Sequence, residues 1–101
     1  MKKFDIKKLI TLRQWLHKHP ELSLKEFNTQ TKIKEELVKL GIKESEIVVK
    51  AKTGLQVDLK GTGSPSEKSK IICLRADIDA LPIKEKNDLI SKSFESKFKI
   101  M

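Results

Sequence analysis

The sequence predicts an α/β fold in which two N-terminal helices are followed by strands. Three observations support this prediction. Apolar residues recur at helical spacing up to about residue 40, and over residues 55–60 they alternate with polar residues as in a strand. The continuous apolar run at residues 71–74 is typical of a strand that is buried on both faces. Since amphipathic helices must bury their apolar sides, we expect the two helices to cover at least one face of a sheet.

The first predicted helix covers residues 5–18. Leu9, Leu12 and Leu16 are separated by three and four residues, so they share one face of a helix. Pro20 disfavours helical geometry in the residue before it, and we therefore expect the helix to end near His19.

The second predicted helix covers residues 24–40. Ser23 is followed three residues later by Glu26, which is the pattern of a capping box whose two side chains satisfy backbone amides at the helix start. Gly41 stands where a helix commonly ends in a left-handed residue. The side chains expected to form the buried stripe are Phe27, Ile33, Leu37 and Leu40.

Three strands are expected near residues 46–50, 54–60 and 70–75. In the second of them, Leu55, Val57 and Leu59 alternate with polar residues, which is typical of a half-exposed strand. The glycine-containing stretch 61–66 lies between two predicted strands. We interpret it as a hairpin turn, because a phosphate-binding loop would precede a helix. Residues 84–101 are polar and lysine-rich, and we expect loop or frayed structure there.

Composition limits the classes of protein to consider. The 101 residues allow one domain at most. The net charge is +8, but the lysines are scattered among glutamates and do not interleave with aromatic residues, so a small basic nucleic-acid-binding protein is the least favoured class. No apolar run approaches the roughly 20 residues that span a bilayer, and we see no secretory signal, so we expect no membrane association. The single cysteine, Cys73, excludes an internal disulfide and favours a reduced, cytoplasmic location.

The strongest candidates for chemistry are Asp77 and Asp79, which leave the end of the apolar run together with Arg75. In an extended chain the side chains of residues two positions apart point to the same side, so we expect the two carboxylates to lie close to each other. Two interpretations stay open on residue types alone. The carboxylates bind a hard divalent cation, or Arg75 pairs with one of them while the other caps a turn.

The remaining metal-ligating residue types favour structural roles. His17 and His19 lie two apart at the end of a helix and therefore on different faces, so we expect them to cap the helix dipole rather than to share a metal ion. Cys73 lies within the apolar run, and we expect a buried, inert thiol.

Several short motifs occur in an order that resembles the amidohydrolase branch of the zinc-type metallopeptidases. This branch includes aminoacylases, hippurate hydrolases, auxin-conjugate hydrolases and N-acyl-amino-acid deacetylases. The longest motif is LRADIDALPI at residues 74–83, with Glu85 following. The others are LHKHPELS at residues 16–23, Glu26 with Thr29 or Thr31, LGI at residues 40–42, and the glycines at Thr53-Gly54 and Gly61-Thr62-Gly63.

This resemblance implies that residues 1–101 are the incomplete opening portion of an αβα-sandwich catalytic domain. It implies a dinuclear centre of zinc or manganese, a small N-acyl amino acid as substrate, hydrolysis of an amide bond, and homo-oligomers within the family. It also implies that Asp79 orients a metal-bound side chain, that Asp77 balances charge beside the metal, and that Arg75 holds the loop by pairing. None of the three is implied to be a metal ligand.

The chain departs from the family pattern in one important respect. The metal-binding block of the family, HACGHDGH, does not occur in the sequence, and Lys99 stands near where a glycine is expected. We therefore expect a chain that stops before the metal block, is inactive by itself and binds no metal tightly. The alternative is a non-catalytic remnant or an interaction module that docks on a full-length relative.

Overall fold

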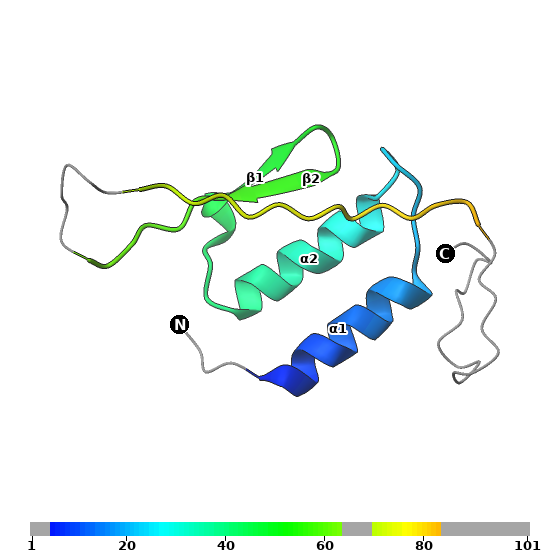
Figure 1. Cartoon of the computed structure of the whole chain (residues 1–101), viewed down its shortest axis with the longest axis horizontal. Helices are drawn as coiled ribbons and strands as arrows, with labels where there is room; N and C mark the ends of the chain where they lie inside the picture. Colours follow the sequence, from blue (N-terminus) through cyan, green and yellow to red (C-terminus); the bar gives the residue numbers. More distant parts are fainter. Residues whose placement is uncertain (1–4, 64–69, 84–101) are drawn as a thin grey trace.

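The computed structural model describes residues 5–63 and 70–83. Two helices are followed by a short 3-10 helix and a two-stranded hairpin, which confirms the predicted α/β order (Figure 1). Residues 84–101 and the second half of the stretch 61–66 lie outside the described residues, so the predictions made for them stay predictions. The elements are α1 (Ile6–Lys18), α2 (Phe27–Lys39), η1 (Glu44–Glu46), β1 (Ile47–Lys50) and β2 (Gly54–Val57).

Helix α1 begins and ends close to the predicted positions. The side chain of Asp5 accepts a hydrogen bond from the amide of Lys7 at 3.0 Å and so caps the first turn. His19 is the C-cap, and its backbone N–H donates to the carbonyls of Trp15 and Leu16. Pro20 follows directly, which explains why the helix stops there.

Helix α2 begins three residues later than predicted, because the expected capping box does not form. Ser23 lies in a turn, and Leu24 has a left-handed backbone with a φ of 65°. Glu26 is the N-cap residue, but its side chain makes no cap hydrogen bond. The end of the helix was predicted correctly: Gly41 has a φ of 99°, and the amide of Ile42 reaches back to the carbonyl of Leu37.

The predicted buried stripe of α2 is only partly correct. Phe27 and Leu40 are 54% and 52% exposed, whereas Ile33 and Leu37 are half-buried. The sheet of the described residues has two short strands, and so small a sheet cannot cover the whole apolar face of this helix.

Strands β1 and β2 form an antiparallel hairpin in which Ile47 pairs with Val57 and Lys50 with Gly54. Ala51 and Lys52 both have a positive φ, which closes the turn between the strands. The side-chain amide of Gln30 on α2 donates to the carbonyls of the hairpin turn at Lys52 and of Gly54. Ile47 is the buried apolar residue of the described part of the chain.

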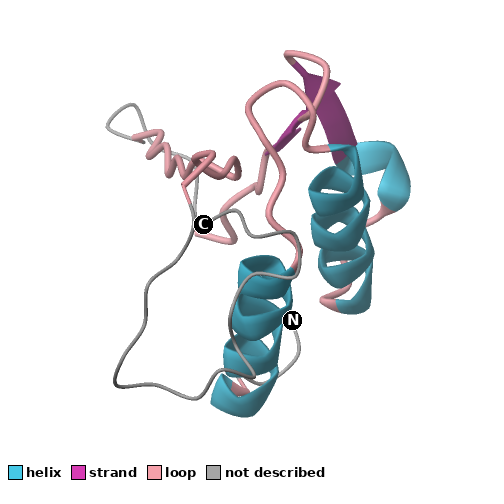
Figure 2. Ribbon diagram, turned by 90° about the vertical axis from the view of Figure 1, so that its right-hand side faces the viewer, coloured by secondary structure: helices cyan, strands magenta, loops and turns pink. Residues whose placement is uncertain are grey.

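The third predicted strand is not formed in the described part of the chain. Residues 70–79 are extended, but no ladder joins them to β1 or β2. They run past α2 in one view (Figure 1) and stand apart from the hairpin in the view turned by 90° (Figure 2). The prediction of burial was also wrong, since Ile71, Ile72 and Leu74 are 100%, 84% and 93% exposed and Cys73 is exposed. A β-strand needs a neighbouring strand to which its backbone is hydrogen-bonded, and none of the described residues provides one here. Across the same residues, neither helix is long and apolar enough to span a bilayer.

Candidate functional site

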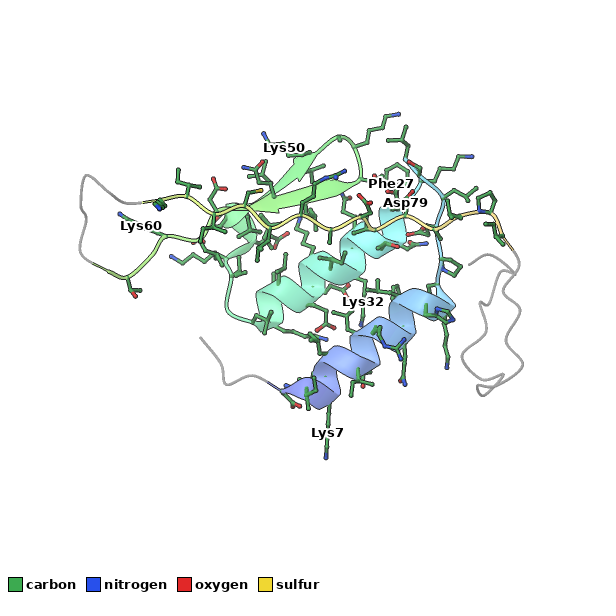
Figure 3. All side chains as sticks on the ribbon, viewed as in Figure 1. Lys7, Phe27, Lys32, Lys50, Lys60 and Asp79 are labelled. Atoms are coloured by element: carbon green, nitrogen blue, oxygen red, sulfur yellow. The ribbon has the colours of Figure 1, made fainter. Side chains whose placement is uncertain are left out.

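The two predicted aspartates line a hollow between the C-terminal half of α1 and residues 77–80. Its volume is about 280 Å³, and Asp77 and Asp79 share its lining with Arg13, His17 and His19. Asp79 lies on the extended segment where this segment passes the N-terminal end of α2 (Figure 3). The fold therefore brings together residues that are about 60 positions apart in the sequence, which spacing alone did not predict.

Arg75 pairs with Asp77, in agreement with one of the two interpretations that the residue types left open. Its Nη2 atom lies 3.2 Å from Oδ1 of Asp77, and the two side chains are 85% and 73% exposed. An ion pair this exposed contributes at most about 1 kcal/mol to stability, so its effect is to orient the two side chains. Asp79 forms no ion pair with any residue in the two described ranges.

The described residues do not by themselves fit a metal centre. A zinc site needs three or four converging nitrogen, sulfur or oxygen ligands. In the described residues no group of three histidine, cysteine, aspartate or glutamate side chains converges closely enough to hold an ion. The chain also contains just two histidines and one cysteine. Among the described residues the site is thus a pair of carboxylates near a helix end.

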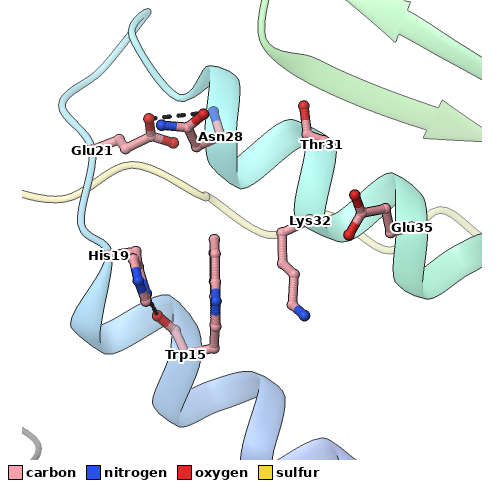
Figure 4. A pocket seen from close by; sticks show the side chains of 7 residues that line it. All are labelled: Trp15, His19, Glu21, Asn28, Thr31, Lys32 and Glu35. Carbon is pink, nitrogen blue, oxygen red and sulfur yellow. Dashed lines mark hydrogen bonds between the residues drawn. The ribbon is translucent and has the colours of Figure 1, made fainter.

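His19 is fixed by contacts within α1 rather than by a ligand. Its ring stacks on Trp15 with 4.1 Å between centroids and an angle of 18°, and its Nδ1 lies 2.8 Å from the carbonyl of Trp15. The Nζ atom of Lys32 lies 5.2 Å from the centroid of the Trp15 ring, at cation–π distance. These side chains line a second hollow of about 270 Å³ between the two helices (Figure 4). The prediction that the histidine caps the helix end is confirmed for His19.

Glu21 connects the aspartate segment to helix α2, a role that the sequence analysis missed. Its backbone carbonyl accepts a hydrogen bond from the amide of Ala80 at 2.7 Å, next to a parallel bridge between Leu22 and Ala80. Its carboxylate caps α2, since Oε1 accepts from the amide and the hydroxyl of Thr29 at 2.6 and 2.7 Å. Oε2 accepts from the amide of Asn28 at 3.3 Å, and Figure 4 shows Glu21 beside Asn28. The available signal was an acidic residue shortly before a helix start, but the capping box at Ser23 and Glu26 competed with it.

Glu26 has a different partner from the one predicted. Its Oε1 atom accepts a hydrogen bond from the hydroxyl of Thr53 at 3.2 Å, and the two residues are 7% and 3% exposed. The interaction ties the first turn of α2 to the hairpin turn. Helix α2 is therefore held from two sides, by Glu21 from the preceding loop and by Glu26 toward the hairpin.

The sequence of this chain is similar to those of known hydrolases. The chain is 42% identical over 85 residues to thermostable carboxypeptidase 1 of Saccharolobus solfataricus. The alignment covers 84% of this chain and 20% of that protein. It is 43% identical over 82 residues to the N-acetylcysteine deacetylase of Bacillus subtilis, covering 81% of this chain and 20% of the deacetylase. No protein-family model matches the chain.

A solved structure decides the family. A Bacillus subtilis protein described as a dinuclear metal-binding peptidase of the M20 family superposes with a TM-score of 0.74 and 41% identity, over 94% of this chain and 24% of that protein. In sequence and fold the chain belongs to the M20 family of peptidases. It corresponds to the start of the M20 peptidase domain and spans about a fifth of the length of the curated relatives. The resemblance found in the motifs is thereby confirmed.

Proposed function

We propose that this M20 chain supplies the N-terminal part of a metal-dependent amidohydrolase that cleaves N-acyl amino acids or related amide conjugates. The observation that carries the proposal is the likeness, in sequence and in fold, to a metal-binding M20 peptidase over nearly the whole of this chain. A deacetylase of an N-acyl amino acid and a carboxypeptidase among the relatives support amide hydrolysis as the reaction.

In this proposal the chain provides the wall beside the metal centre and not the metal ligands. The hollow between α1 and residues 77–80 holds Asp79, which orients a metal-bound side chain, and Asp77, which balances charge and is itself held by Arg75. Zinc or manganese, when bound, supplies an activated water. Its ligands and the general base come from residues outside this sequence, so the 101-residue chain alone is inactive.

Complementation between two polypeptides tests the proposal. The purified 101-residue chain is mixed with Bacillus subtilis N-acetylcysteine deacetylase from which the matching N-terminal segment has been removed, in the presence of Zn²⁺ or Mn²⁺. We expect hydrolysis of N-acetylcysteine by the mixture and by neither component alone.

Two aspartate variants give the test its specificity. Asp79→Ala in the chain should lower the activity of the mixture by about a hundredfold, in the range for loss of a group that orients a metal ligand. Asp58→Ala, at an exposed aspartate just after β2, is the matched control and should leave the activity unchanged. A mixture without hydrolysis at any ratio, or with equal activity for the wild type and Asp79→Ala, contradicts the proposal.

The exposed segment at residues 70–74 favours a second candidate, an interaction module. Ile71, Ile72 and Leu74 are almost fully exposed, and an extended apolar segment of this kind is a template for pairing with another strand. The partner would be the sheet of a full-length relative. This candidate predicts that the chain co-elutes with the intact deacetylase on size-exclusion chromatography and that Leu74→Lys abolishes co-elution. Activity restored only to the shortened deacetylase favours the first candidate instead.

A further inference from the structure

The extended segment that carries Asp77 and Asp79 is attached to the rest of the described chain at one point. Within residues 5–63 and 70–83, the backbone hydrogen bond from residues 70–80 to a distant element is the one from the amide of Ala80 to the carbonyl of Glu21, at 2.7 Å. The parallel bridge between Leu22 and Ala80 lies at the same place. Residues 71–77 are exposed, and next to the attachment point Ile78 is half-buried and Asp79 is exposed.

Glu21 is itself fixed from its other end. Its carboxylate accepts three hydrogen bonds from the first turn of α2, two of them from Thr29, which is 3% exposed. Hydrogen bonds to an ionised carboxylate are stronger than those between neutral groups, and the positive end of the helix dipole favours a negative charge at this position. Glu21 therefore has a defined orientation, with its side chain on α2 and its carbonyl on the aspartate segment.

We propose that Glu21 is a positioning residue: it sets the register at which Asp79 enters the hollow beside α1. The inference rests on the proposed function, since that function gives Asp79 its role. Asp79 is the direct neighbour of the anchored Ala80. A slip of the extended segment by one residue would turn the Asp79 side chain to the opposite face and present its neighbour instead. Anchoring the Ala80 amide excludes that slip.

Amide hydrogen exchange of the 101-residue chain, followed by NMR, tests the anchoring directly. In Glu21→Ala we expect the Ala80 amide to exchange about tenfold faster or more, while amides of the β1–β2 hairpin keep their protection, because the lost contacts are local. Glu21→Gln should be intermediate, since its one remaining carbonyl oxygen can still accept both hydrogen bonds from Thr29. Glu35→Gln, at an exposed glutamate of α2 that lines the second hollow, is the matched control and should match the wild type.

Each outcome of the exchange experiment decides for or against the anchoring. An Ala80 amide that is unprotected in the wild type, or that exchanges at the same rate in Glu21→Ala, overturns the proposal. If Glu21→Ala unfolds altogether and the hairpin loses protection too, Glu21→Gln decides: faster exchange at Ala80 with a protected hairpin supports the proposal, and unchanged exchange overturns it.

Kinetics of the complementation mixture test the consequence for the site. Loss of positioning should lower kcat with little change in KM, with Glu21→Ala more affected than Glu21→Gln and Glu35→Gln unaffected. An unchanged kcat in Glu21→Ala, together with faster exchange at Ala80, overturns the positioning role. If the wild-type mixture shows no hydrolysis, the proposed function fails, and the exchange measurement then decides by itself whether Glu21 sets the register of the segment.

Discussion

The carboxylate of Glu21 accepts two hydrogen bonds from Thr29, one from the backbone amide at 2.6 Å and one from the hydroxyl at 2.7 Å. Because Thr29 is buried, water cannot easily replace the hydroxyl contact. The pair determines where α2 begins, since it satisfies an amide of the first turn that would otherwise have no partner in the helix. It also orients Glu21, whose backbone carbonyl accepts the hydrogen bond from the amide of Ala80 on the aspartate segment.

We predict that Thr29→Val lowers the free energy of unfolding by about 1.5–3 kcal/mol, in the range for losing a hydrogen bond to a charged acceptor. Valine keeps the shape of threonine, so the change isolates the hydroxyl. Urea unfolding followed by circular dichroism measures the effect. Thr31→Val is the matched control, because the hydroxyl of Thr31 donates to the carbonyl of Phe27 on the exposed side of the same helix; it should cost less than about 0.5 kcal/mol. Equal stabilities for the two variants would contradict the prediction.

Gly54 is expected to tolerate no side chain. A Cβ atom at this position would lie 2.9 Å from the backbone carbonyl oxygen of Lys50, its partner in the hairpin. We predict that Gly54→Ala destabilises the chain by about 1–3 kcal/mol, because the strands must shift apart at the turn. The control is Gly61→Ala, where a Cβ meets nothing within 4 Å and which should be neutral. Thermal unfolding of both variants tests this, and a Gly54→Ala variant as stable as Gly61→Ala would show that the hairpin relaxes freely.

Glu36 on α2 should make the stability depend on pH. Partial burial raises the pKa of its carboxyl, and the hydrogen bond from Lys32 and the charge of Lys39 lower it by more, so the net pKa lies below the ordinary 4.5. A carboxyl whose pKa is lower in the folded state stabilises the fold above its unfolded pKa, and this contribution is lost as the pH falls through the folded pKa.

The difference in unfolding free energy between the wild type and Glu36→Gln should therefore be constant from about pH 6 to 8 and vanish toward pH 3, with a size of about 0.3–1 kcal/mol. The same difference should shrink in 1 M salt. Glu35→Gln is the control, since Glu35 forms no ion pair with the described residues. A difference that grows as the pH falls would refute the assignment of the shift to Glu36.

The helices and the hairpin could be predicted from the sequence because their signals are local. Pro20 after α1 and Gly41 after α2 act through their own backbones, and both helix ends appear where these residues place them. The start of α2 could not be predicted in the same way. Ser23 and Glu26 had the spacing of a capping box, but Thr53 from a distant turn takes the Glu26 carboxylate and Glu21 takes the cap. A contact between residues far apart in sequence thus overrides a local pattern.

In the candidate site, too, local features could be predicted from the sequence and long-range contacts could not. Asp77 and Asp79 were singled out by residue type and spacing, and the ion pair of Arg75 with Asp77 agrees with the interpretation in which Arg75 pairs with one of the two aspartates. The hollow that joins Asp79 to His17 was not predicted, because it depends on how the loop at Glu21 pairs with Ala80. Burial of residues 71–74 was wrong for a related reason. An apolar run signals that a strand will be covered, but it does not say by which part of which chain.

The exposed apolar segment should make the isolated chain prone to association. We predict that Ile72→Lys raises the protein concentration at which light scattering begins, because a charge on an edge segment blocks pairing with a second chain. Leu59→Lys is the control, since Leu59 is also exposed, at 66%, but lies outside residues 70–74. Dynamic light scattering of the three proteins at equal concentration decides the matter. If both lysine variants raise the concentration at which scattering begins by the same amount, net charge alone explains the effect and the segment has no special part in association.

The chain alone is expected to bind zinc only weakly. Tight zinc sites need several ligands that converge at about 2.0–2.3 Å. Asp77 is already paired with Arg75, and no third ligating side chain joins the two aspartates among the described residues. Isothermal titration with Zn²⁺ at pH 7 should therefore give a dissociation constant no tighter than about 10 μM, far weaker than structural zinc sites. The shortened deacetylase, which carries the metal block, should gain affinity for zinc when the wild-type chain is added and less when Asp79→Ala is added. Tight binding by the chain alone that disappears in Asp79→Ala would show a coordination sphere assembled within these 101 residues.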